Sequence, residues 1–131
     1  DSGLEYIGES KQQMGDGGFI AQFTDMSTGV VVATTSKNWQ GLVIQTAPLN
    51  VECEKSSDPN TECRFENLEE PKGWVEPNFD DSTWVDASTY TAEEVGTKDG
   101  YDTINWDASA KLIWGSNLKT QNTILWRFLI Q

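Results

Sequence analysis

The apolar residues of this chain occur in runs that are long enough for strands and too short for most helices. β-Branched and aromatic side chains dominate these runs, which is typical of strands. The runs cover residues 19–24, 30–33, 42–45, 111–114 and 123–130. Turn-forming clusters of Gly, Asp, Ser and Thr separate them. Many short strands with turns between them predict an all-β sandwich or barrel.

The last run, Thr123 to Ile130, has one wholly apolar face. Side chains alternate across a strand, so every second residue points to the same side. That side carries Ile124, Trp126, Phe128 and Ile130, and the other carries Leu125, Arg127, Leu129 and Gln131. We therefore expect a core strand near the middle of a sheet.

One short helix is expected after residue 90. Thr91 and Glu94 have the spacing of a capping box, in which the two side chains satisfy each other's backbone N–H groups. Gly96 is well placed to end the helix, because glycine readily adopts the left-handed conformation of a C-terminal cap. The pattern predicts a single helical turn.

The length of 131 residues suits one domain, 1–131, with a single core. Within it we distinguish a polar N-terminal segment, 1–16, and an acidic loop, 50–72. The apolar runs are far shorter than the roughly 20 residues that cross a bilayer, so we expect no membrane insertion. The chain begins with Asp1 and without a basic stretch leading into an apolar one, so we expect a mature or excised form of a longer protein.

Acidic residues outnumber basic residues by 21 to 9, and the formal net charge is −12. Partners of nucleic acids need Lys and Arg to displace counterions, so this composition argues against a nucleic-acid partner. Anionic membranes are disfavoured for the same reason. Such an excess of acid favours solubility in a salty or extracellular setting, and the alternative is a polycation or Ca²⁺ as partner.

The two cysteines, Cys53 and Cys63, both lie in the acidic loop, and the chain has no His. A zinc site takes about four ligands, and a thioredoxin-like motif has two residues between its cysteines, so neither fits. Two interpretations of the cysteines are left: they form a disulfide, or they are two unrelated thiols. Turn-forming residues at 56–60 favour a chain reversal. We expect a disulfide worth roughly 2–3 kcal/mol by loop entropy, and hence a secreted or cell-surface location.

Three segments combine glycines, aromatic residues and turns in a fixed order. The first is Gly17 to Phe23, followed by Gly29 and the turn Thr34 to Trp39. The second is Gly73-Trp74 with Pro77 to Trp84, and the third is Ala110 to Trp114 with the closing Trp126 to Phe128. Together they resemble the galactose-binding-like β-sandwich domains, and the N-terminal accessory domains of bacterial α-L-rhamnosidases in particular. The resemblance covers roughly residues 15 to 130.

The resemblance implies a galactose-binding-like jelly-roll β-sandwich. Such domains usually begin with several strands ahead of the Gly-Gly segment, whereas 16 residues precede Gly17. Two alternatives follow: the sandwich is abbreviated, or an N-terminal part has been removed and stays associated. An associated N-terminal fragment or another chain would protect the exposed sheet edge. The resembled domains often carry calcium, so a Ca²⁺ site of loop carbonyls and one or two carboxylates is an open alternative.

The residues offer little for catalysis, and we expect that the protein is not an enzyme. Nucleophilic triads need a His, which the sequence lacks. A glycosidase needs two carboxylates that flank the scissile bond. Asp80 and Asp81 are adjacent, so in a strand they point opposite ways and in a turn they cap backbone N–H groups. We interpret them as turn caps.

A sugar site needs a flat aromatic face and a few polar groups that pair with hydroxyls. The candidates are Trp39, Tyr101 and Trp106 for stacking, with Asp99 and Asp102 for the hydroxyls. The alternative is that these rings close the ends of the sandwich as core, the role we assign to Trp74, Trp84, Trp114 and Trp126. We expect a non-catalytic carbohydrate-binding or adhesion module of an extracellular protein. The competing hypothesis is a structural or assembly domain with no sugar ligand.

Overall fold

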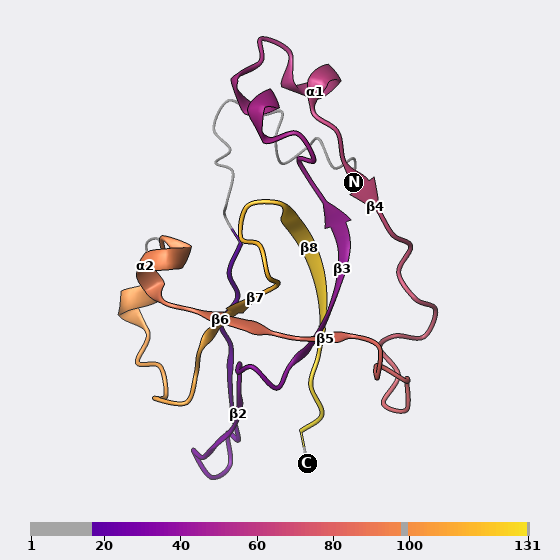
Figure 1. The fold of residues 1–131 in the computed structure, drawn as a ribbon. Helices are drawn as coiled ribbons and strands as arrows, with labels where there is room; N and C mark the ends of the chain where they lie inside the picture. The colour runs from indigo at the N-terminus through magenta and orange to yellow at the C-terminus, as the bar shows by residue number, and fades with distance from the viewer. Residues whose placement is uncertain (1–16, 98–99, 131) are drawn as a thin grey trace.

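The computed structural model describes residues 17–97 and 100–130, which form short antiparallel strands with little helix (Figure 1). The predicted all-β class is confirmed. The strands are β1 (Gln22–Thr24), β2 (Val31–Thr34), β3 (Gln40–Thr46), β4 (Glu66–Asn67), β5 (Val85–Asp86), β6 (Ser88–Tyr90), β7 (Leu112–Trp114) and β8 (Gln121–Arg127). The helical elements are η1 (Val51–Lys55), α1 (Pro59–Glu62), α2 (Ala92–Val95) and η2 (Tyr101–Thr103).

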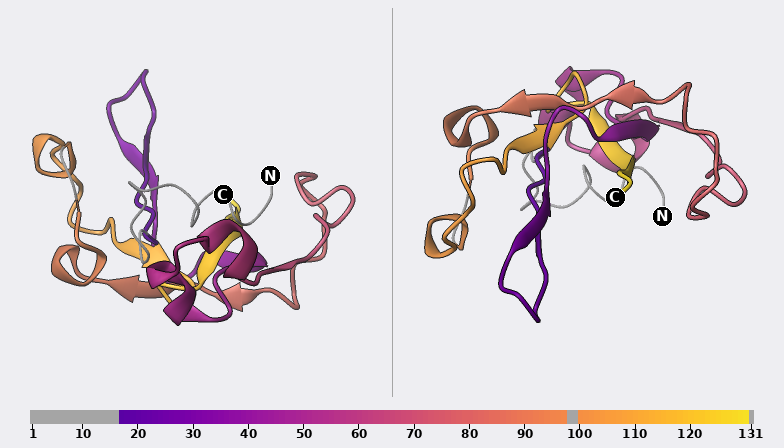
Figure 2. Two further views of the ribbon diagram at one scale, coloured as in Figure 1. Left: turned by 90° about the horizontal axis from the view of Figure 1, so that it is seen from above. Right: turned by 90° about the horizontal axis from the view of Figure 1, so that it is seen from below.

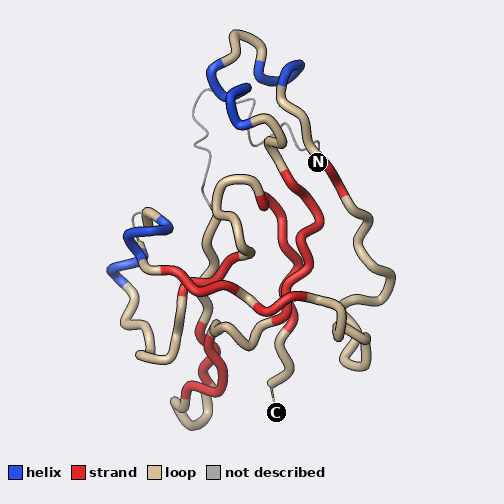
Figure 3. The backbone as a smooth tube through the Cα atoms, in the orientation of Figure 1, coloured by secondary structure: helices blue, strands red, loops and turns tan. Residues whose placement is uncertain are grey.

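The strands form three small sheets (Figure 3). β3 is the central strand of the largest sheet, and β8 pairs with it along one edge. On the opposite edge of β3, β5 pairs with its first residues and β4 with its last. β1 pairs with β2, and β6 pairs with β7. Only Ala87 separates β5 from β6, and its N–H donates to the carbonyl of Trp39 at 2.9 Å. A single extended segment, 85–90, therefore joins the large sheet to the β6–β7 pair.

The expected position of the last strand in the middle of a sheet is wrong. β8 begins at Gln121 and ends at Arg127, and among the described strands it pairs with β3 alone. Residues 128–130 continue beyond the strand, although Phe128 still packs on the core by stacking on Trp39. On the apolar face Ile124 and Trp126 are half-buried, and the one buried residue of β8 is Leu125 on the opposite face.

The β1–β2 hairpin projects away from the rest of the molecule (Figure 2). Its turn depends on Asp25, whose carbonyl accepts from the N–H of Gly29 at 2.7 Å and whose carboxylate accepts from the N–H of Ser27 at 2.8 Å. Gly29 has a φ of 71°, a left-handed conformation that favours glycine. The turn expected between the apolar runs 19–24 and 30–33 is confirmed, and it closes a hairpin.

The core lies where the segment 85–90 runs antiparallel beside β7. Ile113 is fully buried, and Trp39 and Ala87 form a cluster with it. Phe19 and Trp126 are partly buried and pack against this cluster. Phe19 also forms an isolated bridge to Ile113, so the first predicted strand begins at Gln22 and leaves Phe19 as a separate contact.

The capping box of α2 is confirmed. The Thr91 hydroxyl accepts from the N–H of Glu94 at 3.1 Å, and the Glu94 carboxylate accepts from the N–H of Thr91 at 2.7 Å. Gly96 follows in the left-handed conformation, with a φ of 70°. These contacts are local in sequence, so the pattern of residue types was sufficient to predict them.

The predicted disulfide is confirmed. Cys53 and Cys63 are bonded, with 5.2 Å between their Cα atoms, and both are buried. The bridge ties η1 to the end of α1 within the acidic loop. Such a bond indicates an oxidising, extracellular type of environment. None of the helices in the described ranges has the length and apolar character of a membrane span.

Candidate functional site

Tyr101 and Trp106 lie together in the loop that follows α2. Their ring centroids are 6.1 Å apart, with an angle of 31° between the ring planes. The indole N–H of Trp106 donates to the carbonyl of Tyr101 at 3.1 Å, which fixes the orientation of the ring. Both side chains are half-buried. The loop therefore holds two aromatic rings in place and leaves part of their surface open to solvent.

Two hydrogen bonds hold residues 100–107 of this loop in place. The hydroxyl of Thr103 donates to the carbonyl of Gly100 at 2.7 Å and closes the turn of η2. The side chain of Gln22, on β1, accepts from the N–H of Asp107 at 2.8 Å and anchors the end of the loop. A loop that is ordered before binding loses less conformational entropy when a ligand arrives.

Polar side chains of the loop lie beside the two rings in the sequence. Asp102 and Asn105 are exposed, so their polar groups face water and are available to a ligand. Asp107 has a local role: its carboxylate accepts from the N–H and the hydroxyl of Ser109 at 2.8 and 2.6 Å. These bonds, the one from the Ser109 side chain first, lower the pKa of Asp107. Asp99, the remaining predicted sugar ligand, lies outside the described residues.

The structure places Trp39 in the core, which corrects its assignment as a sugar-stacking residue. Its side chain is 7% exposed, and its indole N–H donates to the carbonyl of Thr34 at 2.9 Å. Phe128 stacks on its ring at 5.3 Å, and the rings of Phe19 and Phe23 pack at 5.9 and 6.3 Å. A sugar could reach this face only by displacing part of the core. The aromatic contacts that place Trp39 inside come from two distant segments, residues 19–23 and Phe128.

Metal ligands do not gather in the described part of the chain. None of its Asp, Glu or Cys side chains forms a group of three or more that could hold a metal ion. The acidic residues of the loop and its continuation whose side chains are described all lie at exposed positions: Glu52, Asp58, Glu62, Glu66, Glu69 and Glu70.

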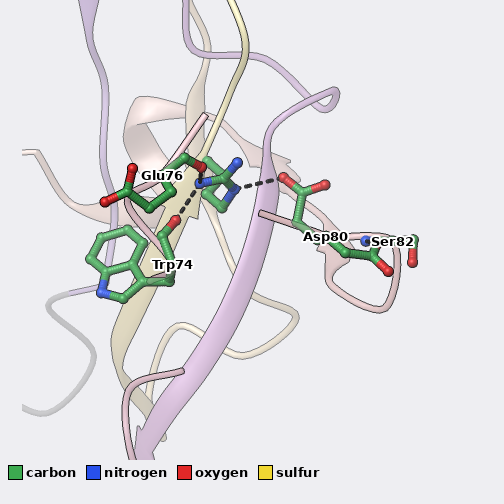
Figure 4. A network of polar contacts seen from close by, with 6 residues as sticks. Trp74, Glu76, Asp80 and Ser82 are labelled. Carbon is green, nitrogen blue, oxygen red and sulfur yellow. Dashed lines mark hydrogen bonds and ion pairs between the residues drawn. The ribbon is translucent and has the colours of Figure 1, made fainter. Parts of the chain in front are cut away.

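Asp81 belongs to a network that fixes residues 74–81 to β8 (Figure 4). Its carboxylate accepts from Nε of Arg127 at 2.8 Å. Nη1 of the same guanidinium donates to the carbonyls of Trp74 and of Glu76, the latter at 3.1 Å. The guanidinium carbon lies 5.2 Å from the ring centroid of Phe79. Asp81 is therefore the partner of a structural arginine, which differs from the turn cap that we expected.

Asp80 does act as a turn cap. Its carboxylate accepts from the N–H of Ser82 at 3.1 Å, and Figure 4 shows Asp80 and Ser82 next to each other at the edge of the network. Hydrogen bonds from the Ser82 side chain and then from its N–H lower the pKa of Asp80 below the ordinary value of 3.8. A group held ionised in this way is suited to capping and poorly suited to donating a proton.

Replacing Ser109 by Ala should raise the pKa of Asp107 towards its ordinary value, because the hydroxyl that donates to its carboxylate at 2.6 Å is lost. A carboxyl whose folded pKa is lowered stabilises the fold above its unfolded pKa, and this contribution disappears as the pH falls through the folded pKa. Titration of the carboxyl carbons by NMR, in wild type and Ser109→Ala, measures the shift. Asp80 is the internal control, since its own serine is unchanged and its pKa should stay low. An unchanged titration curve for Asp107 would contradict the role of the Ser109 hydroxyl.

Sequence reasoning missed a cavity of about 270 Å³ on one face of the large sheet. Its apolar wall comes from β3 and β8, where Gly41 pairs with Trp126 and Val43 pairs with Ile124. Cross-strand partners share a face, so these four residues lie on the same side of the sheet. A Cβ atom on Gly41 would lie 2.6 Å from Cζ3 of Trp126, so only glycine lets this ring lie against the strand. A glycine inside a strand was the available signal, because it marks a close approach.

Comparison of this chain with protein-family models, with curated proteins and with solved structures found no match.

Proposed function

We propose that this protein is a non-catalytic carbohydrate-binding or adhesion module of an extracellular protein, built on a galactose-binding-like jelly-roll β-sandwich. The observation that carries the proposal is the Tyr101–Trp106 pair, whose rings are fixed by a hydrogen bond yet stay half-exposed. A sugar ring presents an apolar face that stacks on an aromatic ring, and hydroxyls that need polar partners at its edge. Asp102, with Asp99 as a second candidate, supplies carboxylate acceptors for those hydroxyls.

The acidic charge of the chain limits the kind of glycan. With a formal net charge of −12, long-range repulsion disfavours sulfated or uronic-acid polymers. Exposed carboxylates accept hydrogen bonds from neutral hydroxyls, so neutral glycans are the class that this surface suits best. The disulfide agrees with a secreted or cell-surface location, where such ligands occur.

A glycan array tests the proposal. Wild-type protein should be retained by a subset of neutral glycans, and Trp106→Ala should reduce retention by about tenfold or more, which corresponds to about 1.4 kcal/mol. Val75→Ala is the matched control, because this exposed apolar residue lies outside the loop. The array is run with Ca²⁺ and again with a chelator, which decides whether a calcium ion takes part. Absence of any retained glycan under both conditions would refute the binding function.

A structural or assembly domain is the second candidate, and the exposed apolar side chains favour it. Phe128, Leu129 and Ile130 follow β8 with 40%, 66% and 47% of their surfaces exposed. On the hairpin, Val30 and Val32 are 58% and 48% exposed. Clusters of exposed apolar residues often mark contacts with another protein chain. Under this hypothesis the partner is an N-terminal fragment or another chain, and native mass spectrometry of the full natural protein would detect it.

A further inference from the structure

One edge of β8 has no neighbouring strand in the described part of the protein. β8 pairs with β3 along its other edge, and β3 is the only described element that runs along it (Figure 1). In an antiparallel strand, alternate residues direct their N–H and C=O groups to opposite edges. Half of the backbone groups of β8 therefore lie on the unpaired edge, where they can pair with another strand.

The unpaired stretch of this edge extends over residues 122–130. Gln121 is already occupied, because its N–H donates to the carbonyl of Asn117 at 3.3 Å and its carbonyl accepts from the indole N–H of Trp114 at 2.7 Å. Apart from the pairing with β3, no backbone group of residues 122–130 bonds to the backbone of another described residue. The stretch is therefore long enough for a strand of nine residues.

The edge of β8 lacks the features that usually protect a sheet edge from other chains. Short strands, charged side chains and prolines are such features. Apart from β3, the other described strands have two to four residues, whereas β8 has seven. Residues 122–130 contain no proline, and their one charged side chain, Arg127, is directed to Asp81 and to the carbonyls of Trp74 and Glu76.

Charge and exposure also mark this edge as a contact surface. Residues 108–130, which include β7 and β8, contain no acidic residue, in a chain that has 21. After β8 the apolar side chains of Phe128, Leu129 and Ile130 are exposed. The centres of protein interfaces are depleted of Asp and Glu and rich in aromatic and other apolar side chains. The net charge of −12 opposes contact between two copies here only at long range, where salt screens it.

The unpaired stretch is complementary to itself. Two copies related by a two-fold axis pair the same strand antiparallel, so the axis passes through the middle of the paired stretch. A pairing that uses all of residues 122–130 has Trp126 at its centre, opposite the partner's Trp126. Ile124 then lies opposite the partner's Phe128, and Arg127 does not face the partner's Arg127. Aromatic pairs and aromatic–β-branched pairs stabilise antiparallel sheets, and like charges directly opposite each other destabilise them.

We propose that β8 pairs with β8 of a second copy of this chain, antiparallel across a two-fold axis. The sheet of β3 and β8 then continues from one copy into the other. Because both copies use the same edge, the assembly closes at two chains. Residues 128–130 extend the strand in the dimer and lose part of their exposure. The proposal concerns assembly and is independent of sugar binding at Tyr101 and Trp106.

Sedimentation velocity of the full chain, at concentrations up to about 0.5 mM and in about 0.3 M salt, tests the dimer. The mass should rise from that of one chain towards that of two. Leu129→Lys places a charge on the edge and should weaken the dimer by about tenfold or more. Val75→Lys is the matched control, because Val75 is 68% exposed and Leu129 is 66% exposed. It adds the same charge outside β8 and should leave the dimer within about twofold. A protein that stays a single chain at every concentration, or a dimer that responds equally to both variants, would overturn the proposal.

Amide hydrogen exchange identifies the edge that pairs. Between dilute and concentrated protein, exchange in residues 122–130 should slow by about tenfold or more, whereas exchange in α2 should not change. Slow exchange of residues 122–130 at every concentration would mean that another part of the same chain fills the edge. Fast exchange at every concentration would mean that the edge does not pair with a second copy. Either result would overturn the β8–β8 dimer.

Discussion

Replacing Trp39 by Ala is expected to lower the free energy of unfolding by about 3–5 kcal/mol. The side chain is 7% exposed, and the rings of Phe19, Phe23 and Phe128 pack around it. Its loss would leave a cavity between residues 19–23 and Phe128, the residue that follows β8. It would also remove the donor to the carbonyl of Thr34. Chemical denaturation followed by far-UV circular dichroism measures the change.

Two controls establish that burial causes this loss. Trp39→Phe keeps an aromatic ring and should destabilise the protein less than Trp39→Ala. Met26→Ala, at a side chain that is 92% exposed, should change the free energy of unfolding by no more than about 0.5 kcal/mol. If Trp39→Ala unfolded at the same denaturant concentration as wild type, Trp39 would not be a core residue, and its role as a sugar-stacking residue would have to be restored.

Replacing Arg127 by Ala is expected to lower the free energy of unfolding by about 2 kcal/mol. The ion pair is half-buried, with 15% of the Arg127 side chain and 34% of the Asp81 side chain exposed, so its loss should cost more than the roughly 1 kcal/mol of a surface pair and less than the roughly 3–5 kcal/mol of a buried one. Beyond this pair, the guanidinium holds the carbonyls of Trp74 and Glu76 and contacts the ring of Phe79. Because these contacts anchor residues 74–81, amide hydrogen exchange there should speed up more than exchange in α2.

Arg127→Lys is the informative control for this network. Lysine keeps the positive charge but cannot reproduce the planar fork that donates to several acceptors at once. It should therefore recover only part of the lost stability. Combining Arg127→Ala with Asp81→Ala should cost less than the sum of the two single changes, because the single changes remove the same interaction. Strict additivity would show that the two side chains do not interact.

Features that depend on near neighbours in the sequence could be predicted. The capping box of Thr91 and Glu94 and the turn at Asp25 involve residues within four positions of each other, so the residue types define the contacts. The disulfide could be expected because turn-forming residues lie between its cysteines. The contact between Tyr101 and Trp106 is also local, because the hydrogen bond that holds the Trp106 ring joins residues five positions apart.

Features that depend on register between distant strands could not be predicted. The pattern of residues 123–130 identifies an apolar face, but it does not say that β8 pairs with β3 alone among the described strands. Trp39 looks like a loop residue in the sequence, and its burial comes from phenylalanines near both ends of the described chain. The cavity exists because Gly41 happens to face Trp126 across two strands. Each of these depends on which segments meet in space.

The central claim, that a sugar ring stacks on Trp106 with Tyr101 beside it, is tested most directly by intermolecular nuclear Overhauser effects. The probe is the glycan that the array retains most strongly, titrated into wild-type protein with its six Trp rings assigned. We predict contacts between the C–H protons of one sugar ring and the ring protons of Trp106, and their loss in Trp106→Ala. Contacts to other residues only, or unchanged contacts in Trp106→Ala, would contradict the account.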